Sequence, residues 1–431
     1  MLDKFFKITE NKSTLKTEVI AGITTFMTMV YILAVNPSIL SATGMDKGAV
    51  FTATALSAVV ATLVMAIVAK LPFALAPGMG LNAFFAFTVV LGMGYSWQFA
   101  LTAVFLEGIV FILLTIFNIR ELIVNSIPMN LKHAVSVGIG LFIAFIGLKS
   151  TGLIVDNPAT LVTLGDMKSP SVLVGLAGVI ITGFFLIKKV KGAILLGILS
   201  ATILGLFTGV TTIPEDFQLL SLPPSISPIF FQFDFSQIFT LDMLVVLFTF
   251  LFVDMFDTVG TLIGVSSKSD MLDKDGKIPS VKQALFADSI GTFIGAILGT
   301  STVTTYVESA AGVAEGGRTG MTALTTAAMF AMALFFGGVF MIIPPAATAS
   351  ALIIVGLFMI SPIQKINLDD FTEAIPAFFT IIMMPLTYSI AEGIVFGMLS
   401  YVFLKLIAGK HKEIKPIMYV IVVLFLIKFY I

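Results

Sequence analysis

Three carboxylates stand inside long apolar stretches of this chain, where an ionisable side chain is costly. Asp254 and Asp257 occur in FLFVDMFDTVGTLIG, and Glu308 occurs in TSTVTTYVESAAGVA. An acid at the centre of a membrane-spanning helix costs about 3 kcal/mol on insertion scales, so such residues persist mainly for function. A carboxylate accepts hydrogen bonds from the ring N–H groups of a heterocycle, and it also binds and releases a proton. These residues are therefore candidates for both substrate recognition and proton coupling.

Two apolar stretches contain residues that interrupt a helix. In LPFALAPGMGLNAFFAF, residues 71–87, a proline and two glycines break the helix, whereas β-branched residues before Tyr306 give TSTVTTYVESAAGVA an extended character. Each stretch then restarts as a helix with a polar residue, Asn82 or Glu308, beside the free N–H groups of the new N-terminus. Interrupted segments at equivalent positions in two halves of a transporter form its binding site.

The candidate site residues come from three segments. The residues that we expect at the substrate are Gly80, Asn82, Phe84, Asp254, Asp257, Thr258, Thr305, Tyr306, Glu308 and Ser309. Of these, Asp254, Asp257 and Glu308 are also the candidates for proton coupling. The Phe84 ring can offer a stacking face, but in a chain with 41 phenylalanines a core or lipid-facing role has at least equal weight.

The composition places the chain in a membrane. Of its 431 residues, 58% are hydrophobic and 11% are charged, whereas about a quarter of an average soluble protein is charged. The absence of cysteine excludes disulfides, thiolate catalysis and thiolate metal sites. His133 and His411 lie far apart beside lysines, so we expect no metal site and no cofactor. Residues 1–16 are charged and amphipathic, which predicts a cytoplasmic tail without a cleavable signal peptide.

Fourteen apolar stretches approach the roughly 20 residues that a membrane-spanning helix needs. They cover residues 17–40, 48–69, 72–91, 97–117, 132–149, 170–188, 191–210, 242–265, 280–299, 301–316, 320–343, 346–363, 371–388 and 391–408. The sequence thus predicts an all-α polytopic protein with short extended stretches in the third and tenth segments. A last apolar stretch, 417–427, is short and lysine-flanked, and we interpret it as interfacial or re-entrant.

Basic residues fall on alternate sides of this arrangement. With a cytoplasmic N-terminus, the inside connections carry most of the Lys and Arg residues, as cytoplasmic loops do. These residues are Lys70, Arg120, Lys132, Lys188, Lys189, Lys191, Lys268, Lys274, Lys277, Lys282, Arg318, Lys365, Lys405, Lys410, Lys412 and Lys415. The connection 211–241 contains neither Lys nor Arg and is predicted to lie outside. Lys47, Lys149 and Lys168 are minor exceptions.

Two sequence matches indicate an internal repeat. AILLGILSATIL in the seventh segment matches GIVFGMLSYVFL in the fourteenth and aligns Gly197 with Gly397. SIPMNLKHAVSVGIGLFI, which leads into and forms most of the fifth segment, matches IIPPAATASALIIVGLFM, which does the same for the twelfth, and the match aligns Gly140 with Gly356. Apolar helices resemble one another by composition, but two matches in the same order are harder to attribute to chance.

Seven segments per half is an odd number, so the halves must insert in opposite directions. The first inverted repeat covers residues 17–210 and the second covers residues 242–408. Residues 211–241 form the extracellular linker between them, and residues 409–431 form a C-terminal cytoplasmic or interfacial segment.

Two stretches have a misleading likeness to ligand-binding loops. Residues 312–319 spell G-x-x-x-x-G-R-T, close to a phosphate-binding loop, but an arginine replaces the lysine and no strand, loop and helix of a soluble domain surround it. DKDGK at 273–277 lacks the ligand spacing of a calcium loop, and a cytoplasmic turn explains it. We expect no nucleic acid partner.

The motifs APGMGLNAFFAF, FLFVDMFDTVGTL and GTSTVTTYVESAAGVAEGGRTG, in that order, closely resemble the adenine/guanine/hypoxanthine permeases, the azaguanine-type branch of the nucleobase:cation symporters. The resemblance runs over the whole chain. It implies fourteen segments in two inverted repeats, with a core domain from segments 1–4 and 8–11 and a gate domain from segments 5–7 and 12–14. It also implies that Asn82, the eighth-segment aspartates and Glu308 hold a purine between the third, eighth and tenth segments.

The resemblance leaves open which aspartate contacts the substrate. Aligning Gly260 with the glycine after the acid in related uracil and xanthine carriers favours Asp257. Asp254 can equally take that role and leave Asp257 for proton coupling. The acid in those relatives is usually Glu, and the shorter Asp leaves more room for a purine.

Residues and resemblance together predict a proton-coupled importer of purine bases in the plasma membrane, and not an enzyme. A site that pairs ring N–H groups rejects wrong ligands strongly, because its buried polar groups then stay unpaired. The main alternative is an anion carrier or channel of the same architecture, against which three carboxylates and the lack of a midplane Lys or Arg argue. The sequence leaves open the preferred purine, sodium instead of proton coupling, and homodimerisation.

Overall fold

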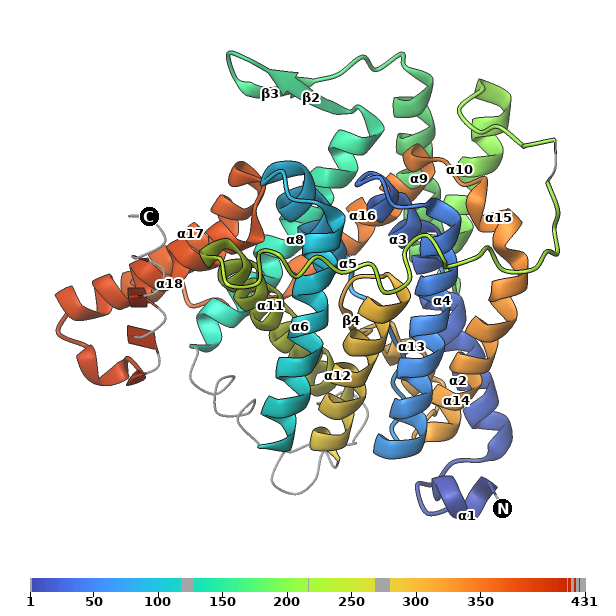
Figure 1. Cartoon of the computed structure of the whole chain (residues 1–431), viewed down its shortest axis with the longest axis horizontal. Helices are drawn as coiled ribbons and strands as arrows, with labels where there is room; N and C mark the ends of the chain where they lie inside the picture. Colours follow the sequence, from blue (N-terminus) through green and yellow to red (C-terminus); the bar gives the residue numbers. More distant parts are fainter. Residues whose placement is uncertain are drawn as a thin grey trace.

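The computed structural model describes residues 2–117, 128–215, 217–267 and 280–416, with five single positions beyond them. These positions are 418, 419, 422, 423 and 426. Arg120, the lysines at 268, 274 and 277, the DKDGK turn and most of the stretch 417–427 lie outside the described residues. Figure 1 shows a bundle of helices and two very short sheets, of which the hairpin of β2 (Ile154–Asn157) and β3 (Leu161–Leu164) projects beyond the helices at the top of the view.

Helices make up most of the described chain. The α-helices are α1 (Leu2–Phe6), α2 (Leu15–Met29), α3 (Ile32–Ser41), α4 (Lys47–Val64), α5 (Met79–Ala83), α6 (Trp97–Ile116), α8 (Met129–Thr151), α9 (Pro170–Ile187), α10 (Ala193–Thr208), α11 (Leu241–Ser267), α12 (Val281–Leu298), α13 (Ser309–Ala314), α14 (Gly320–Ala333), α15 (Gly337–Met341), α16 (Pro345–Ile360), α17 (Phe371–Thr387) and α18 (Ile390–Ile407). The π-helices η1 (Met65–Ala69) and η2 (Phe84–Gly92) extend α4 and α5, and η3 (Leu334–Phe336), η4 (Ser361–Lys365) and η5 (His411–Glu413) are 3₁₀ turns. The strands are β1 (Leu75–Pro77), β2 (Ile154–Asn157), β3 (Leu161–Leu164) and β4 (Val303–Thr305).

Within the described residues, nine helical stretches are long and apolar enough to cross a membrane. They are Leu15–Ser41, Lys47–Ala69, Trp97–Ile116, Met129–Thr151, Pro170–Ile187, Val281–Leu298, Gly320–Met341, Pro345–Lys365 and Ile390–Ile407. Shorter apolar helices, such as Ala193–Thr208 and Phe371–Thr387, accompany them. The multi-pass helical fold is thus confirmed, while the number of fourteen spanning segments stays a prediction.

The helices pack as two groups, which meet along a smaller set of contacts (Figure 1). In the first group, α2 to α6 pack against α11 to α15; for example, α12 contacts α4 and α6, and α14 contacts α2 and α4. In the second group, α8, α9 and α10 pack with α16, α17 and α18. The groups touch where α5 and α11 meet α8, where α11 meets α18, and where α2 and α3 meet α10 and α16.

Glycines allow the closest helix contacts of the second group. A Cβ atom on Gly140 would lie 2.7 Å from the carbonyl oxygen of Gly356, and one on Gly356 would lie 2.5 Å from that of Gly140, so α8 and α16 cross backbone to backbone. A Cβ on Gly197 or on Gly397 would lie 1.8 Å from a threonine hydroxyl of the preceding helix. The glycines aligned by the sequence matches therefore make closely similar contacts.

The two predicted extended stretches are strands that pair with each other. β1 and β4 run antiparallel, with Leu75 opposite Thr305 and Pro77 opposite Val303. Both strands are fully buried in the first group of helices. The prediction of short extended stretches in these segments is confirmed, and their pairing joins parts of the chain that are far apart in the sequence.

Two features of the fold do not appear in the sequence prediction. The first apolar segment is broken between α2 and α3 at Val30 and Tyr31. The strands β2 and β3 form an antiparallel hairpin, whose turn is held by Asn157, because its side chain accepts hydrogen bonds from the N–H groups of Ala159 and Thr160. A search for long apolar stretches does not detect so short a polar turn.

Two of the basic residues that break the predicted alternation make local contacts. Lys47 donates to the carbonyl oxygens of Met341, the last residue of α15, and Ile343, just after it, at 3.0 and 3.3 Å. Lys149 forms a 3.1 Å ion pair with Asp156 of the β2–β3 hairpin. Each of these positive charges thus has a specific partner in the fold.

Candidate functional site

The pairing of β1 and β4 brings the two interrupted segments together. The N–H of Gly78, just after β1, donates to the carbonyl of Thr302 at 2.9 Å, and the N–H of Tyr306, just after β4, donates to Ala74 at 3.0 Å. The Tyr306 hydroxyl donates to the carbonyl oxygen of Pro77 at 2.5 Å. Each strand therefore holds the point at which the other segment turns into its helix.

The helices that follow the strands begin at slightly different places from those expected. α5 begins at Met79, and Asn82 lies within its first turn rather than at the restart. Glu308 occupies the N-cap position of α13, and its side chain makes no capping hydrogen bond. The difference arises because Gly78 is already extended and supplies the carbonyl that accepts from the Asn82 N–H.

Asn82 is fully buried and connects the two interrupted segments. The hydroxyl of Ser301, immediately before β4, donates to its side-chain oxygen. Its amide nitrogen lies 3.5 Å from the carbonyl oxygen of Pro77. In this structure Asn82 is therefore a buried link between β1, α5 and the start of β4.

The eighth-segment acids of α11 have different surroundings. Asp254 is fully buried, and its Oδ1 accepts from the Thr258 hydroxyl at 3.3 Å. The same Thr258 oxygen lies 2.7 Å from Oδ1 of Asp288 on α12 and 2.7 Å from the hydroxyl of Thr304 on β4. Asp254 thus belongs to a buried polar cluster that holds α11, α12 and β4 together.

Asp257 and Glu308 are the two predicted acids that stay partly exposed. The residue that follows each acid, Thr258 or Ser309, is fully buried. The two acids lie close enough for their charges to repel each other. These two residues retain some accessible surface inside a group of buried helices, whereas Asp254 retains none. The structure therefore separates these two acids from Asp254.

Glu308 has a partner that the sequence prediction missed. The hydroxyl of Tyr31, at the break between α2 and α3, donates to Glu308 Oε1 at 2.6 Å. The Tyr31 side chain is 1% exposed. The helix break is the feature that could have drawn attention to Tyr31, but no proline or glycine marks it in the sequence.

The remaining predicted residues lie around these acids in supporting positions. A Cβ atom on Gly80 would lie 2.8 Å from Ile139 of α8, so Gly80 stands at the contact between the two groups of helices. The Phe84 ring is buried and packs edge-on against Phe250, with ring centroids 4.9 Å apart. This contact agrees with a core role for Phe84, the alternative to a stacking role at the substrate.

Two residues of the tenth segment complete the set. Thr305, at the end of β4, is buried, and its hydroxyl has no hydrogen-bond partner among the described residues. The Ser309 hydroxyl, at the first position of α13, accepts from the N–H of Ala74 at 3.0 Å. Ser309 therefore fixes the start of α13 against β1.

Two further buried acids lie close to the crossing and were not predicted. Glu107 of α6 is fully buried, and the Thr302 hydroxyl donates to its Oε2 at 2.5 Å. Asp288 of α12 is fully buried beside Thr258. Each occurs in an apolar stretch of the sequence, so the reasoning that selected Asp254 applies to both. We refer to Asn82, Asp254, Asp257, Thr258 and Glu308 as the strand-crossing site.

The G-x-x-x-x-G-R-T stretch is a connection between helices. The buried Glu18 carboxylate of α2 accepts from the N–H groups of Arg318 and Thr322, at 3.0 and 3.2 Å, and so caps the start of α14. The Arg318 guanidinium donates to the carbonyl oxygens of Val313 and Gly317, at 2.6 and 2.8 Å, at the end of α13. Arg318 and Glu18 therefore satisfy two adjacent helix ends.

A multi-pass helical bundle that buries carboxylates, hydroxyls and an amide where two broken segments cross is the architecture of a secondary membrane carrier. Comparison with known proteins agrees. A model of the Permease family matches residues 16–396. The chain is 51% identical to a putative permease of Methanocaldococcus jannaschii, 46% identical to a guanine/hypoxanthine permease of Bacillus subtilis and 45% identical to an adenine permease of Escherichia coli. These alignments cover 99% of this chain and 96–98% of each relative.

The chain therefore belongs to the permease family that its motifs resemble, and it is a transporter rather than an enzyme. Its fold is similar to the transmembrane domain of the cyanobacterial bicarbonate transporter BicA, with a TM-score of 0.65 at 16% identity over 89% of this chain and 97% of that one. It is also similar to the murine anion transporter Slc26a9, with a TM-score of 0.62 at 12% identity over 90% of this chain and 68% of that one. At these identities the likeness concerns the fold alone.

Proposed function

We propose that this chain imports purine nucleobases, namely hypoxanthine, guanine or adenine, by proton symport. The substrate class follows from relatives named adenine and guanine/hypoxanthine permeases that align over nearly the whole chain. The observation that carries the proposal is the pair of partly exposed carboxylates, Asp257 and Glu308, at the strand crossing. Two acceptors on separate helices suit a flat heterocycle with more than one N–H donor.

In this proposal Asp257, and not Asp254, contacts the purine. The supporting observation is exposure, because Asp254 is fully buried against Thr258 while Asp257 is partly exposed. Asn82 acts as a buried support of the two strands. A ligand without matching N–H groups leaves the acids unpaired on binding, which costs about 1–3 kcal/mol for each unsatisfied group and more for a charged one.

We further propose that transport moves the first group of helices, as the core domain, against the second group, as the gate domain. The strand-crossing site lies within the first group, which corresponds to segments 1–4 and 8–11, the expected core domain. The second group corresponds to segments 5–7 and 12–14, the expected gate domain. Gly140 and Gly356 occupy matching positions of the two predicted repeats and contact each other's carbonyl oxygens. This symmetric contact supports two inverted repeats, 17–210 and 242–408, as the origin of the division into two groups.

Proton coupling follows from the cost of moving charge in a membrane. An uncompensated carboxylate is expensive away from water, and a bound proton removes that cost. Asp257 and Glu308 are the acids of the site that retain accessible surface, so we assign proton uptake to them first. Asp254, a buried acid of the same helix as Asp257, is the alternative proton acceptor. In the cell membrane, with a cytoplasmic N-terminus, the proton gradient then drives import.

The likeness in fold to anion transporters does not favour an anion here. Among the described residues, Lys405 is the one basic side chain that is fully buried, and it lies near the end of α18, outside the strand-crossing site. An anion at that site would face carboxylates without an opposing cation. The charge of the site therefore supports a neutral, N–H-bearing substrate.

Uptake of radiolabelled hypoxanthine, guanine and adenine tests the proposal in cells that lack their own purine carriers. We expect saturable uptake by the wild type that collapses with a protonophore and persists when sodium is replaced by choline. Glu308→Gln and Asp257→Asn should abolish it, whereas Glu215→Gln, a change of an exposed acid in the connection 211–241, should not. No purine uptake by a correctly inserted wild type would reject the proposal.

A further inference from the structure

Tyr31 is a residue of the first segment that reaches the strand-crossing site. Its backbone stands between α2 and α3, where the helix is interrupted, and its side chain is buried. The phenol of a buried tyrosine needs a hydrogen-bond partner, because an unsatisfied hydroxyl is costly. That partner is Oε1 of Glu308, at 2.6 Å.

The helices next to the two residues, α2 before Tyr31 and α13 after Glu308, are in close contact. A Cβ atom on Gly312 of α13 would lie 2.1 Å from the Thr25 hydroxyl and 2.5 Å from the carbonyl oxygen of Ala21, both on α2. The backbone of α13 therefore lies directly on α2. Tyr31 and Glu308 both belong to the first group of helices, so their hydrogen bond does not cross between the two groups.

This hydrogen bond makes the two oxygens of the Glu308 carboxylate unequal. Oε1 accepts from the Tyr31 hydroxyl, whereas no side chain among the described residues donates a hydrogen bond to Oε2, which is therefore the less engaged acceptor. The Tyr31 hydroxyl thus fixes the orientation of a charged Glu308 carboxylate, so that Oε2 is the oxygen presented to a ligand rather than either oxygen equally.

We infer that Tyr31 is a positioning residue for substrate recognition: it holds the Glu308 carboxylate so that Oε2 faces a ring N–H of the ligand. The inference rests on the proposed function, and it adds the first segment to the three that the sequence placed at the site. Tyr31 acts through Glu308 and does not itself contact the ligand. The substrate class that this arrangement selects is a planar heterocycle with an N–H at the position facing Glu308.

Tyr31→Phe removes the hydroxyl and keeps the ring. A hydrogen bond to a charged group contributes enough to change affinity about tenfold to hundredfold, so we expect the KM for hypoxanthine to rise by that factor. The maximal rate per transporter at the membrane should change by less than about twofold, because the lost hydrogen bond lies within the first group and does not join the two groups that move relative to one another. Discrimination against the N-methylhypoxanthine that blocks the Glu308 contact should weaken as well.

Tyr401→Phe is the matched control, since Tyr401 is a buried tyrosine of α18 in the second group. It should leave KM and the ranking of the N-methylhypoxanthines unchanged. A purely structural role for Tyr31 would lower the amount of active protein and leave both quantities unchanged. The split between KM and maximal rate therefore separates positioning from folding.

A second measurement tests whether Tyr31 works through Glu308. Equilibrium binding of hypoxanthine to purified protein is compared for the wild type, Tyr31→Phe, Glu308→Gln and the double variant. Because a hydrogen bond to a neutral amide is weaker than one to a carboxylate, the effect of Tyr31→Phe should shrink several-fold in the Glu308→Gln background. An equal effect in both backgrounds would overturn the inference.

The outcomes also separate this inference from the proposed function. Normal hypoxanthine uptake by the wild type together with an unchanged KM in Tyr31→Phe would overturn the role of Tyr31 alone. Absence of purine uptake by a correctly inserted wild type would overturn the proposed function and, with it, the role of Tyr31. A raised KM with unchanged maximal rate supports both.

Discussion

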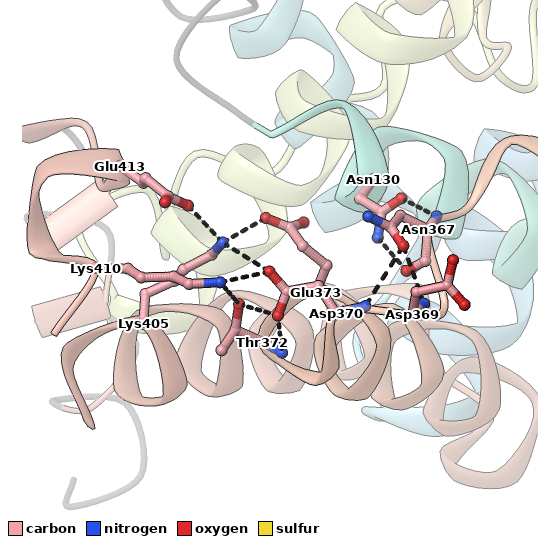
Figure 2. Close-up of polar contacts among 9 residues, drawn as sticks. All are labelled: Asn130, Asn367, Asp369, Asp370, Thr372, Glu373, Lys405, Lys410 and Glu413. Carbon is pink, nitrogen blue, oxygen red and sulfur yellow. Dashed lines mark hydrogen bonds and ion pairs between the residues drawn. The ribbon is translucent and has the colours of Figure 1, made fainter. Parts of the chain in front are cut away.

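The strand-crossing site and the end of α18 both bury charged side chains, but they pair them differently. Near the end of α18, Lys405 is 1% exposed, and its Nζ lies 2.8 Å from Glu373 and 2.6 Å from Glu413. Lys410 donates to Asp370 at 2.6 Å (Figure 2). We call these five residues the Lys405 cluster. Beside it, Figure 2 shows Asn130 and Asn367, whose reciprocal hydrogen bonds tie α8 to the start of α17.

The difference lies in the sign of the neighbours. In the Lys405 cluster each positive charge meets carboxylates, so the charges compensate one another and join α17, α18 and the turn after α18. In the strand-crossing site, carboxylates lie beside hydroxyls and other carboxylates. Compensated charges stabilise a fold, whereas gathered like charges need a proton or a ligand to complete them. The comparison thus distinguishes charge that supports the structure from charge that supports transport.

The largest effect should come from changing an exposed acid of the strand-crossing site. Asp257→Asn should lower hypoxanthine uptake about a hundredfold or more, because a charged hydrogen-bond acceptor for the ligand is lost. The thermal stability of the purified protein should stay close to that of the wild type. Asp254→Asn, one turn away and buried, is the comparison variant. If it abolishes uptake while Asp257→Asn does not, the assignment of the substrate contact is reversed.

Breaking the Lys405 cluster should lower thermal stability and leave transport intact, the opposite of the effect expected for Asp257→Asn. Lys405→Met leaves Glu373 without its buried cation, and the loss of one partner from a buried ion pair costs about 3 kcal/mol. We expect a lower unfolding temperature in detergent and an unchanged KM for hypoxanthine. Lys410→Met, at a half-exposed lysine, should cost less than about 1 kcal/mol. A raised KM in Lys405→Met would contradict the separation of the two clusters.

A neutral change in the same pair of helices tests packing apart from charge. A Cβ on Gly397 of α18 would lie 1.8 Å from the Thr380 hydroxyl of α17, so Gly397→Ala should cost about 1–3 kcal/mol through overpacking. Adding Thr380→Ala removes that hydroxyl and should recover part of the loss in thermal stability. Should the double variant be no more stable than Gly397→Ala, the contact with Thr380 is not the cause.

The smallest effect concerns acid conditions. Hydrogen bonds from Lys410 and Thr372 hold the pKa of Asp370 well below its ordinary value of 3.8. Since the folded pKa is lowered, the stabilisation from Asp370 is fully present above pH 3.8 and is lost as the pH falls below it. The unfolding temperatures of the wild type and Asp370→Asn should therefore differ by a constant amount between pH 5 and 8. If the difference in unfolding temperature between the wild type and Asp370→Asn grew as the pH fell, the lowered pKa of Asp370 would be contradicted.

The parts of the site that were predicted from the sequence depend on local signals. The proline and glycines after β1 and the β-branched run of β4 determine strand and helix breaks within their own segments. Asp257 and Glu308 stand out because acids are rare in apolar stretches. The same signal marks Glu107 and Asp288, so those residues could have been included.

The missing parts depend on contacts between distant segments. Tyr31 sits in an apolar stretch like many other aromatic residues, and only the fold places its hydroxyl against Glu308. Lys405 looks like one more cytoplasmic basic residue, while its burial depends on Glu373 and Glu413 from two other elements. Exposure likewise distinguishes Asp257 from Asp254, and it is a property of the packed helices rather than of the sequence.

The pairing of β1 with β4 also has a consequence for the order in which the protein is made. β1 leaves the ribosome with the first half of the chain, and its partner strand is synthesised only late in the second half. Until then the backbone groups of β1 and the Asn82 side chain lack their native partners. A nascent chain that stops before β4 therefore exposes unpaired polar groups in the membrane, which makes it recognisable to quality-control proteases.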